Sequence, residues 1–411
     1  MCRRSLICLV LLLHAASHVL SFDKEAEKQR MVNEALHAYA QLFIDSWGTR
    51  LPSDEFIQAV RSAAFRPKLV SGSMAQNPLV LLTLANHYAL NHTAKVFVGN
   101  LAKLGLAQHL VIVYIGGGGG MEACGKILSH GMQCVLDQAR THPSSSVVLE
   151  GAFGSSSRIG LGHASFLSTG FSRILAILDT LSLGMDCLFL DSDQVFFRDP
   201  LPYLLDRDAD VIVTGDCAGR DDRVGSFTLP PTNNNIGLLL FKAQNPGLVR
   251  CISDWLYRMV SSAMEFKPQW DQTTFQPAME RCTRKFNLSM IMLRPDRFPY
   301  TCMGPCGCNI TGISDVDKGN ASDFITDPSA AVAAAAATSL GSRLICPLSS
   351  MKEWIGFHFP CVVASQKHGL MTYYLEMWET EQGTRLAREV DQEASHSCPG
   401  PALSHRSLTQ L

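Results

Sequence analysis

Two acidic residues, Asp191 and Asp193, stand one residue apart at the end of an apolar run in the segment CLFLDSDQVFFRDP, residues 187–200. An isolated buried carboxylate is costly, so the pair needs a cation, hydrogen bonds or a solvent-lined cleft. Carboxylate oxygens prefer hard divalent cations, and two residues at this spacing on an extended backbone face the same way about 6.6 Å apart. The pair predicts a divalent-metal site whose open positions diphosphate oxygens could fill. Two turn or capping aspartates are the structural alternative.

The neighbouring segments must position this pair. Residues 187–190 predict a buried strand, and ligands of open α/β sheets bind at the carboxyl ends of such strands. Arg173 is expected to open an amphipathic helix upstream, which Gly184 would end as a C-cap glycine. Residues 141–170, rich in Ser and Gly, are interpreted as a loop.

Apolar runs typical of strands alternate with helical segments along most of the chain. Helices are predicted at 54–65, 91–104, around Cys124 and Ile127, and from Pro246 to Met259 after a capping Asn245. Strands are predicted at 79–85, 110–115, near Cys134, and at 187–190, 211–213, 236–241, 291–293 and 354–358. This alternation predicts an α/β fold with a mostly parallel sheet that helices cover on both faces.

Composition limits the classes of function. The 411 residues are 46% hydrophobic, enough for one large α/β domain or two ordinary ones. A net charge of −2 with 18% charged residues offers no basic surface, so nucleic acid is not an expected partner. Residues 1–21 have a basic start and an apolar core shorter than the roughly 20 residues that span a bilayer. They predict a cleaved signal peptide or a short signal anchor, which would be the chain's contact with a membrane.

Cysteines and glycosylation motifs favour the same compartment. Fourteen cysteines are present, and Cys2 and Cys8 lie in the targeting segment, which leaves an even twelve for an oxidising lumen. Cys124 and Cys134 are a plausible local disulfide pair. The cysteines of residues 302–308 could form disulfides, which this compartment favours, or bind zinc. Four acceptor motifs for N-glycosylation begin at Asn91, Asn287, Asn309 and Asn320.

The chain is expected to divide into four parts. After residues 1–21, residues 22–70 predict a helical stem without visible chemistry, and residues 71–381 predict a single catalytic domain. Residues 302–350 form an irregular insert rich in Cys and Ala within that domain, and the polar residues 382–411 are expected to be a disordered tail.

The acidic segment, with the Arg-headed helix before it and Arg198-Asp199-Pro200 after it, resembles the metal-binding segment of the nucleotide-diphospho-sugar transferases. These are eukaryotic glycosyltransferases of the GT-A fold, and the segment is most similar to the branch of secretory-pathway galactosyl-, xylosyl- and arabinosyltransferases. The resemblance covers residues 79–300 and reaches 378 more loosely. It implies a Rossmann-like GT-A catalytic domain.

Further segments resemble the family in the same order. Thr83 and Asn86 match the element that cradles the nucleotide base and ribose, although an ordinary strand-to-loop junction has the same pattern. Arg173 stands where the family carries a basic residue that neutralises the donor diphosphate. Asn235 and Gly237 match an Asn-x-Gly element near the sugar, in which Gly allows close backbone approach.

Three later residues complete the implied site. Asp271 and Gln272 resemble the family's Asp-Gln pair, which contacts the sugar hydroxyls beside the reacting carbon; an N-cap aspartate is a compatible structural role. His358 matches the late histidine that supplies a further metal ligand, and a buried core histidine is the alternative. Together with Asp191 and Asp193, His358 is thus expected to hold Mn²⁺ or Mg²⁺.

Lys367 corresponds to a trailing lysine that contacts the phosphates. Its surroundings depart from the family pattern, which has Asn two residues after the histidine and Gly further on, where Pro360 and Ala364 or a neighbour stand here.

The resemblance implies transfer of a sugar from a nucleotide-diphosphate donor, by analogy a UDP-sugar, to a hydroxyl of a glycoprotein or polysaccharide. It also implies retention of the anomeric configuration and a place in the secretory pathway, most often the Golgi lumen.

Three other functions could use parts of this sequence. A haloacid dehalogenase-type phosphatase would use Asp191 and Asp193 in its first motif, but too few residues separate them from Gly215-Asp216 for the intervening elements of that fold. A dinucleotide site at residues 116–120 fails because Met121 occupies the third glycine position. A catalytically silent sugar-binding module of the same fold stays open.

Overall fold

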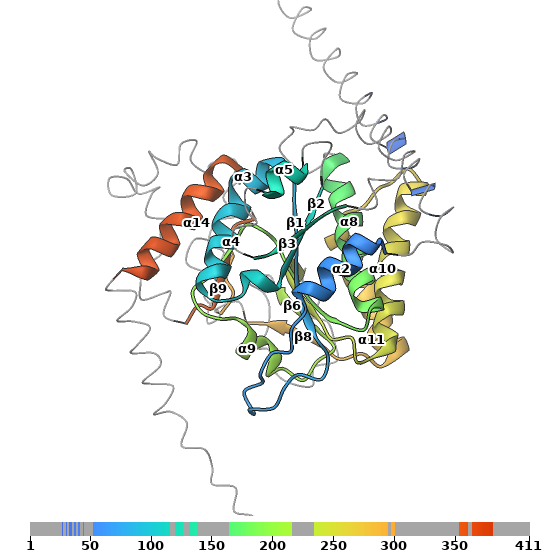
Figure 1. Cartoon of the computed structure of the whole chain (residues 1–411). Helices are drawn as coiled ribbons and strands as arrows, with labels where there is room; N and C mark the ends of the chain where they lie inside the picture. The colour runs from blue at the N-terminus through green and yellow to red at the C-terminus, as the bar shows by residue number, and fades with distance from the viewer. Residues whose placement is uncertain are drawn as a thin grey trace, which may run out of the picture.

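A computed structural model describes residues 52–115, 120–125, 131–137, 164–215, 234–294, 297–300, 353–360 and 364–380, with scattered positions between 27 and 44. At its centre lies a seven-stranded sheet with the strand order β3-β2-β1-β4-β7-β6-β8 (Figure 1). Strand β7 is antiparallel to its neighbours β4 and β6, and the other neighbouring pairs are parallel. The predicted α/β fold with a mostly parallel central sheet is confirmed. The strands are β1 (Leu79–Ala85), β2 (Leu110–Tyr114), β3 (Gln133–Leu136), β4 (Asp186–Leu190), β6 (Val211–Gly215), β7 (Asn234–Phe241) and β8 (Met290–Leu293).

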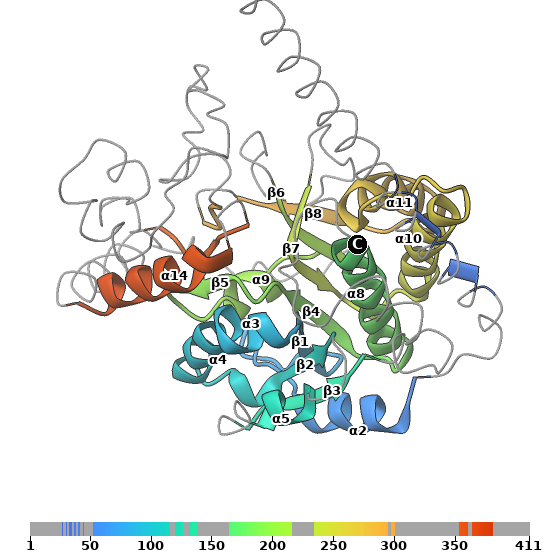
Figure 2. The ribbon, with the colours of Figure 1, turned by 90° about the horizontal axis from the view of Figure 1, so that it is seen from above.

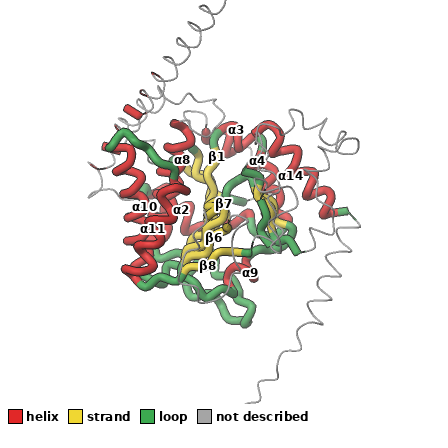
Figure 3. Tube along the Cα trace, turned by 180° about the vertical axis from the view of Figure 1, so that it is seen from behind, coloured by secondary structure: helices red, strands yellow, loops and turns green. Residues whose placement is uncertain are grey.

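Helices cover both faces of this sheet, which explains why β1, β2, β4 and β7 are buried at every residue. Figures 2 and 3 show the two helical layers from above and from behind. One layer holds α2 (Asp54–Ala63), α8 (Ala164–Ser182), α10 (Pro246–Met264) and α11 (Asp271–Phe286). The other holds α3 (His87–Asn91), α4 (Thr93–Lys103), α9 (Leu201–Leu205), α14 (Ala364–Glu379) and a small sheet of β5 (Gln194–Phe196) and β9 (Gly356–His358). A 3-10 turn, η1 (Ala107–His109), and α5 (Gly120–Gly125) complete the described elements.

Two helices begin where the sequence predicts. The side chain of Asn245 accepts a hydrogen bond from the Gly247 amide at 2.9 Å and caps α10. The hydroxyl of Ser53 caps α2 by accepting from the Phe56 amide at 3.2 Å. Gly184, with φ of +76°, follows the end of α8 as predicted, because glycine adopts this left-handed conformation without strain.

Two predicted helix boundaries are wrong. Arg173 lies in the middle of α8, which begins at Ala164 within the segment interpreted as a loop. Phe171 is buried in the core there, so tertiary packing outweighs the weak helix preference of the neighbouring Ser and Gly residues. The helix predicted at 91–104 is α4, which begins two residues later at Thr93 because His92 has a non-helical backbone. The short helix α3 before it was not predicted, and there the Asn91 side chain donates back to the His87 carbonyl at 2.8 Å.

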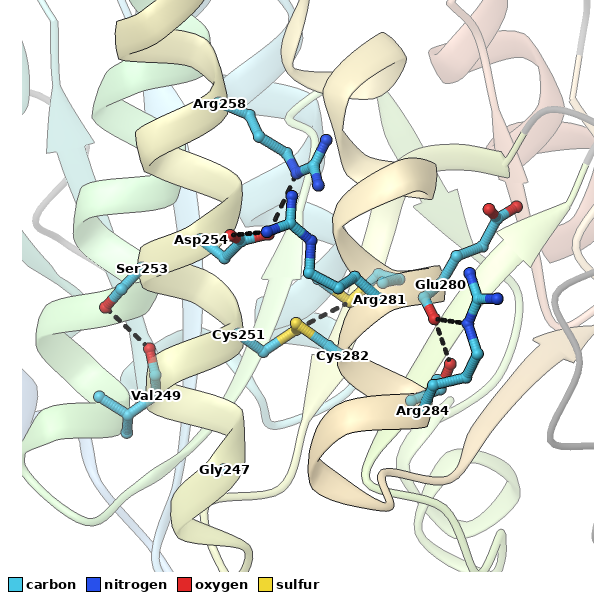
Figure 4. Close-up of a disulfide and its surroundings, with 12 residues drawn as sticks. Gly247, Val249, Cys251, Ser253, Asp254, Arg258, Glu280, Arg281, Cys282 and Arg284 are labelled. Carbon is cyan, nitrogen blue, oxygen red and sulfur yellow. Dashed lines mark hydrogen bonds and ion pairs between the residues drawn. A yellow bond between two sulfur atoms is a disulfide. The ribbon is translucent and has the colours of Figure 1, made fainter.

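Two disulfides between described residues brace the fold. The predicted pair Cys124–Cys134 is confirmed and joins α5 to β3. A second pair that the sequence did not identify, Cys251–Cys282, joins α10 to α11 (Figure 4). It fixes the helix whose first residue is Asp271 against its neighbour.

Several predicted segments lie outside the described residues: the targeting segment 1–21, the glycine run 116–119, the insert 302–350 with its cysteines, and the tail 382–411. Among the helices that are described, none combines the length and the apolar character needed to cross a bilayer.

Candidate active site

The acidic pair occupies a tight turn between β4 and β5. The Asp191 amide donates to the Gly237 carbonyl at 2.7 Å, which ties the turn to β7. The pair was expected to converge along an extended strand, but it converges through this turn instead. Asp191, Asp193 and His358 each offer one ligand atom, and these atoms lie within 4.8 Å of one another.

His358 reaches the turn because β5 and β9 form a short antiparallel ladder in which Gln194 lies opposite His358. The Phe359 amide also donates to the Asp193 carbonyl at 3.0 Å. The His358 Nε2 atom lies 3.1 Å from Asp193 Oδ1 and 3.6 Å from Asp191 Oδ2. The structure therefore brings together the three residues predicted as metal ligands; metal binding itself stays a prediction.

The contact made by Nδ1, the second ring nitrogen of His358, indicates which nitrogen carries the proton of the neutral ring. Asn235 Oδ1 accepts from the Gly237 amide at 3.0 Å, and it lies 3.2 Å from His358 Nδ1. An amide oxygen cannot donate, so we assign the proton of the neutral ring to Nδ1. The Nε2 lone pair then faces two carboxylates, an arrangement that suits a shared cation and that a partner on Nδ1 typically supports.

Gly237 is required by the packing of this ring. A Cβ at this position would lie 2.2 Å from His358 Cε1, closer than two non-bonded carbon atoms approach each other. The predicted role of Gly237, close backbone approach, therefore takes the form of contact with the histidine ring. Its carbonyl also accepts a hydrogen bond from the Gln194 side chain.

Arg173 links the acidic turn to α11. Its guanidinium contacts Asp191 at 2.7 Å and Asp271 at 2.8 Å, and it lies over the Phe189 ring. Gly170, one turn earlier in α8, makes this approach possible, because a Cβ there would lie 2.9 Å from Asp271 Cβ. Gly170 was not predicted to belong to the site. A single glycine within a helix is the one feature of the sequence that could have indicated it.

The titration of these groups follows from burial and their neighbours. Burial raises the pKa of Asp191 and outweighs the opposing effect of Arg173, while the like charge of Asp193 adds to the rise. Burial would also raise the pKa of Asp193, but the Lys367 ammonium, and His358 when its ring is protonated, hold it well below its usual range. Burial would lower the pKa of Arg173, but the surrounding carboxylates outweigh this effect and raise it.

Lys367, on α14, forms an ion pair with Asp193. The chain therefore places a cation on each carboxylate of the pair, Arg173 on Asp191 and Lys367 on Asp193. The contact of Lys367 with the donor phosphates, which the resemblance implies, stays a prediction.

Thr83 and Asn86 lie at the same edge of the sheet, because β1 is the parallel neighbour of β4. Thr83 is fully buried and its hydroxyl has no hydrogen-bond partner among the described residues. The Asn86 side chain caps α3 by accepting from the Ala89 amide at 2.8 Å. The described part of the chain shows no hydrogen bond between either side chain and the acidic turn.

Gln272 lines a cleft that opens beside Asp271. Its backbone amide donates to Asp271 Oδ1 at 2.9 Å, and its side chain borders a cleft of about 380 Å³. Asn234, the first residue of β7, also borders this cleft. The sequence predicted a role for Asn235 and none for Asn234.

Comparisons with known proteins agree with the family predicted from the sequence. Residues 139–310 match the family of nucleotide-diphospho-sugar transferases, which confirms the predicted resemblance. A search of curated proteins found no match.

Several solved structures are similar to this chain. Mouse xyloside xylosyltransferase 1 in its apo form is 14% identical, with 55% of this chain and 88% of that chain covered and a TM-score of 0.34. The galactosyltransferase LgtC with donor and acceptor sugar analogs is 14% identical, with coverage of 71% and 95% and a TM-score of 0.34. The glycosyltransferase GlyE of Streptococcus pneumoniae is 13% identical, with coverage of 76% and 63% and a TM-score of 0.36.

Proposed function

From the match of residues 139–310 to the nucleotide-diphospho-sugar transferase family, we propose that this chain is a metal-dependent glycosyltransferase with a GT-A catalytic domain. It transfers a sugar from a nucleotide-diphosphate donor, a UDP-sugar, to a hydroxyl of a glycoprotein or polysaccharide. The convergence of Asp191, Asp193 and His358 on one point is the observation that carries this proposal.

The ligand set fits a divalent cation. Two carboxylates and the unprotonated Nε2 of His358 all present lone pairs to the same point, and Gly237 leaves the space that the ring needs. Oxygen ligands with one imidazole suit Mn²⁺ or Mg²⁺. When bound, the cation would neutralise the charge that develops on the leaving diphosphate.

The two cationic side chains prepare the site for an anionic donor. Arg173 and Lys367 each hold one carboxylate of the pair, so they keep both in place before the donor arrives. A planar guanidinium can also bind phosphate oxygens, and a lysine ammonium can contact them as a point charge. With the donor bound, Arg173 and Lys367 would each interact with both a carboxylate and the diphosphate.

Asp271 and Gln272 orient the sugar. The Asp271 carboxylate is held by Arg173 and by the Gln272 amide, so its position is fixed in the buried wall of the site. It is therefore engaged and poorly placed to act as a covalent nucleophile. The acceptor oxygen then bonds to the anomeric carbon as the bond to the diphosphate breaks, and the leaving phosphate oxygen takes the hydroxyl proton. This route retains the anomeric configuration; NMR of the product would contradict it by showing an inverted linkage.

The site acts in the lumen of the secretory pathway, most often the Golgi. The predicted targeting segment, the glycosylation motifs and the disulfides Cys124–Cys134 and Cys251–Cys282 support this location. Contact with a membrane would be through an uncleaved N-terminal anchor.

Hydrolysis of a panel of UDP-sugars with Mn²⁺ tests the proposed function. We expect slow release of UDP that depends on Mn²⁺, at least about 100-fold lower in Asp193→Asn because a charge-stabilising group is lost. Asp186→Asn, at the other end of β4, is the matched control and should keep the parent rate. Equal turnover by the parent and Asp193→Asn would favour a silent sugar-binding module.

A further inference from the structure

The cleft beside Gln272 has an unusual floor. Asn234 is only 2% exposed, yet both the oxygen and the nitrogen of its side-chain amide lack a hydrogen-bond partner among the described residues. Buried polar groups are almost always paired, because an unpaired one costs the folded protein about 1–3 kcal/mol. An amide at the floor of a cleft with no partner among the described residues suits a ligand that both donates and accepts.

The walls of the cleft define the chemistry of that ligand. Trp270 is 37% exposed and offers an aromatic surface at the rim. Gln272 and Gln276 add two more amides, and the Gln276 amide donates to Glu280 at 3.1 Å. Glu280 is the single charged side chain among the described residues that line the cleft, and no lysine or arginine lies among them.

A neutral sugar ring matches these walls. Each of its hydroxyls both donates and accepts, as amide groups require, and its C–H face is apolar enough to pack on an exposed tryptophan. An anionic sugar would meet the Glu280 carboxylate without a compensating cation.

The cleft lies on the opposite side of β7 from the metal-ligand cluster. Successive strand residues point to opposite faces, so Asn235 reaches His358 while Asn234 faces α11. Gln272 borders the cleft directly beside Asp271, which Arg173 connects to the acidic turn. The cleft is thus close to the site but separate from the groups expected to hold the donor diphosphate.

We infer that this cleft is the acceptor subsite and that it binds a neutral pyranose of the acceptor glycan, with Asn234 as its specificity-determining residue. The inference rests on the proposed function, because it names the acceptor class of that transfer. It assigns the acceptor to the Asn234 side of β7, next to the donor sugar that Asp271 and Gln272 orient.

Binding of neutral methyl glycosides tests the inference without turnover. Methyl β-galactoside, β-glucoside, α-mannoside and β-xyloside would be titrated against the full chain by saturation-transfer NMR, with methyl β-glucuronoside as the anionic probe. We expect at least one neutral glycoside to bind and the glucuronoside to bind at least about threefold more weakly. Asn234→Leu should weaken the neutral ligand at least about tenfold, because it removes two hydrogen bonds. No binding of any neutral glycoside, or equal affinity in Asn234→Leu, would overturn the inference.

A stability measurement separates ligand binding from a structural role. If Asn234 is kept for a ligand, Asn234→Leu should raise the urea midpoint of the free protein, because an unpaired buried amide is replaced by an apolar side chain. A lower midpoint with unchanged glycoside affinity would assign Asn234 a structural role. Should Asn234→Leu fail to fold, Gln276→Ala at the rim gives the same binding test. Arg281→Ala, on α11 but beside Asp254 in a different groove, is the matched control and should bind like the parent (Figure 4).

Discrimination between neutral and anionic glycosides gives a second test of the inference. Glu280→Gln should reduce the discrimination against the glucuronoside, and unchanged discrimination would count against the assigned chemistry. The two proposals fail separately. Without UDP release from any UDP-sugar the proposed function fails, and without glycoside binding only the acceptor subsite fails.

Discussion

Strand β4 has an aspartate at each end, and the two carboxylates have different kinds of partners. Asp186, the first residue of the strand, accepts hydrogen bonds from the Ala243 amide at 2.7 Å and from the Asn77 side chain at 3.1 Å. Asp191, directly after the strand, instead faces Asp193, His358 and Arg173. Neutral donors satisfy the first carboxylate, whereas the second is one member of a charged cluster.

The same contrast extends to the neighbouring strands. Asp210, just before β6, accepts from the Ser289 amide at 2.8 Å and from its hydroxyl at 2.9 Å. At the carboxyl edge, the described cluster holds three carboxylates, Asp191, Asp193 and Asp271, against the two cations Arg173 and Lys367. These groups leave one negative charge over. The amino edge is therefore built for stability, and the carboxyl edge is built to take up a cation.

Removing the charge of Arg173 should show the largest difference between the two edges. Arg173→Met leaves Asp191 and Asp271 without their cation in a buried setting, so we expect a loss of about 3–5 kcal/mol in the free energy of unfolding. Urea denaturation in EDTA measures it. Lys242→Met is the control at the amino edge, where the ammonium donates to the Arg207 carbonyl and interacts with Asp186 at longer range, and it should cost about 1 kcal/mol. Equal losses would mean that the two edges are electrostatically alike.

The part of the site that follows from local pattern was predictable. The apolar run before Asp191 predicted a buried strand, and the position of the acidic pair at its carboxyl end followed from the alternation of strands and helices. The strand and the position of the pair need only neighbours in sequence and the topology of a parallel sheet. Asn235 and Gly237 were instead assigned from the family resemblance.

The contacts between distant segments were not predictable from pattern. The ladder of β5 and β9 is three residues long on each side and joins segments far apart in the chain, so no periodicity signals it. Arg173 was assigned to a helix start because the Ser- and Gly-rich residues before it have weak helix propensity, which packing overrides. That Asn234 has no hydrogen-bond partner among the described residues depends on three-dimensional surroundings that a sequence does not record.

The second-largest difference between the two ends of β4 is expected in stabilisation by a bound metal ion. Mn²⁺ at about 100 times its dissociation constant should stabilise the parent by about 2.7 kcal/mol, because the ion binds the folded chain only. Asp193→Asn should lose most of this gain, and Asp186→Asn should keep it. Thermal or urea unfolding with and without Mn²⁺ gives the comparison without any substrate. A full gain in Asp193→Asn would place the ion elsewhere.

The glycine beneath His358 offers a steric test of the carboxyl edge. Gly237→Ala would force the ring away, because the added Cβ would lie 2.2 Å from Cε1, and we expect a cost of about 1–3 kcal/mol with weaker Mn²⁺ binding. Gly99→Ala is the matched control, since a Cβ there meets no atom within 4 Å in the interior of α4. It should raise stability by about 0.5–1 kcal/mol. Unchanged Mn²⁺ affinity in Gly237→Ala would show that the ring position does not matter to the ion.

The smallest effect is expected at the start of β4, from pH. Burial raises the pKa of Asp186 above its ordinary 3.8, so between the two values the folded chain binds more protons than the unfolded one. Its contribution to stability is therefore full below 3.8 and is lost as the pH rises through the folded pKa. Asp186→Asn keeps an oxygen for both hydrogen bonds and does not titrate, so its stability relative to the parent should rise with pH by at most about 1 kcal/mol. Urea unfolding of both proteins from pH 4 to 8 measures the difference. A relative stability that falls with pH would mean that the carboxylate form of Asp186 is favoured in the folded chain, and that this end of β4 depends on charge as the other end does.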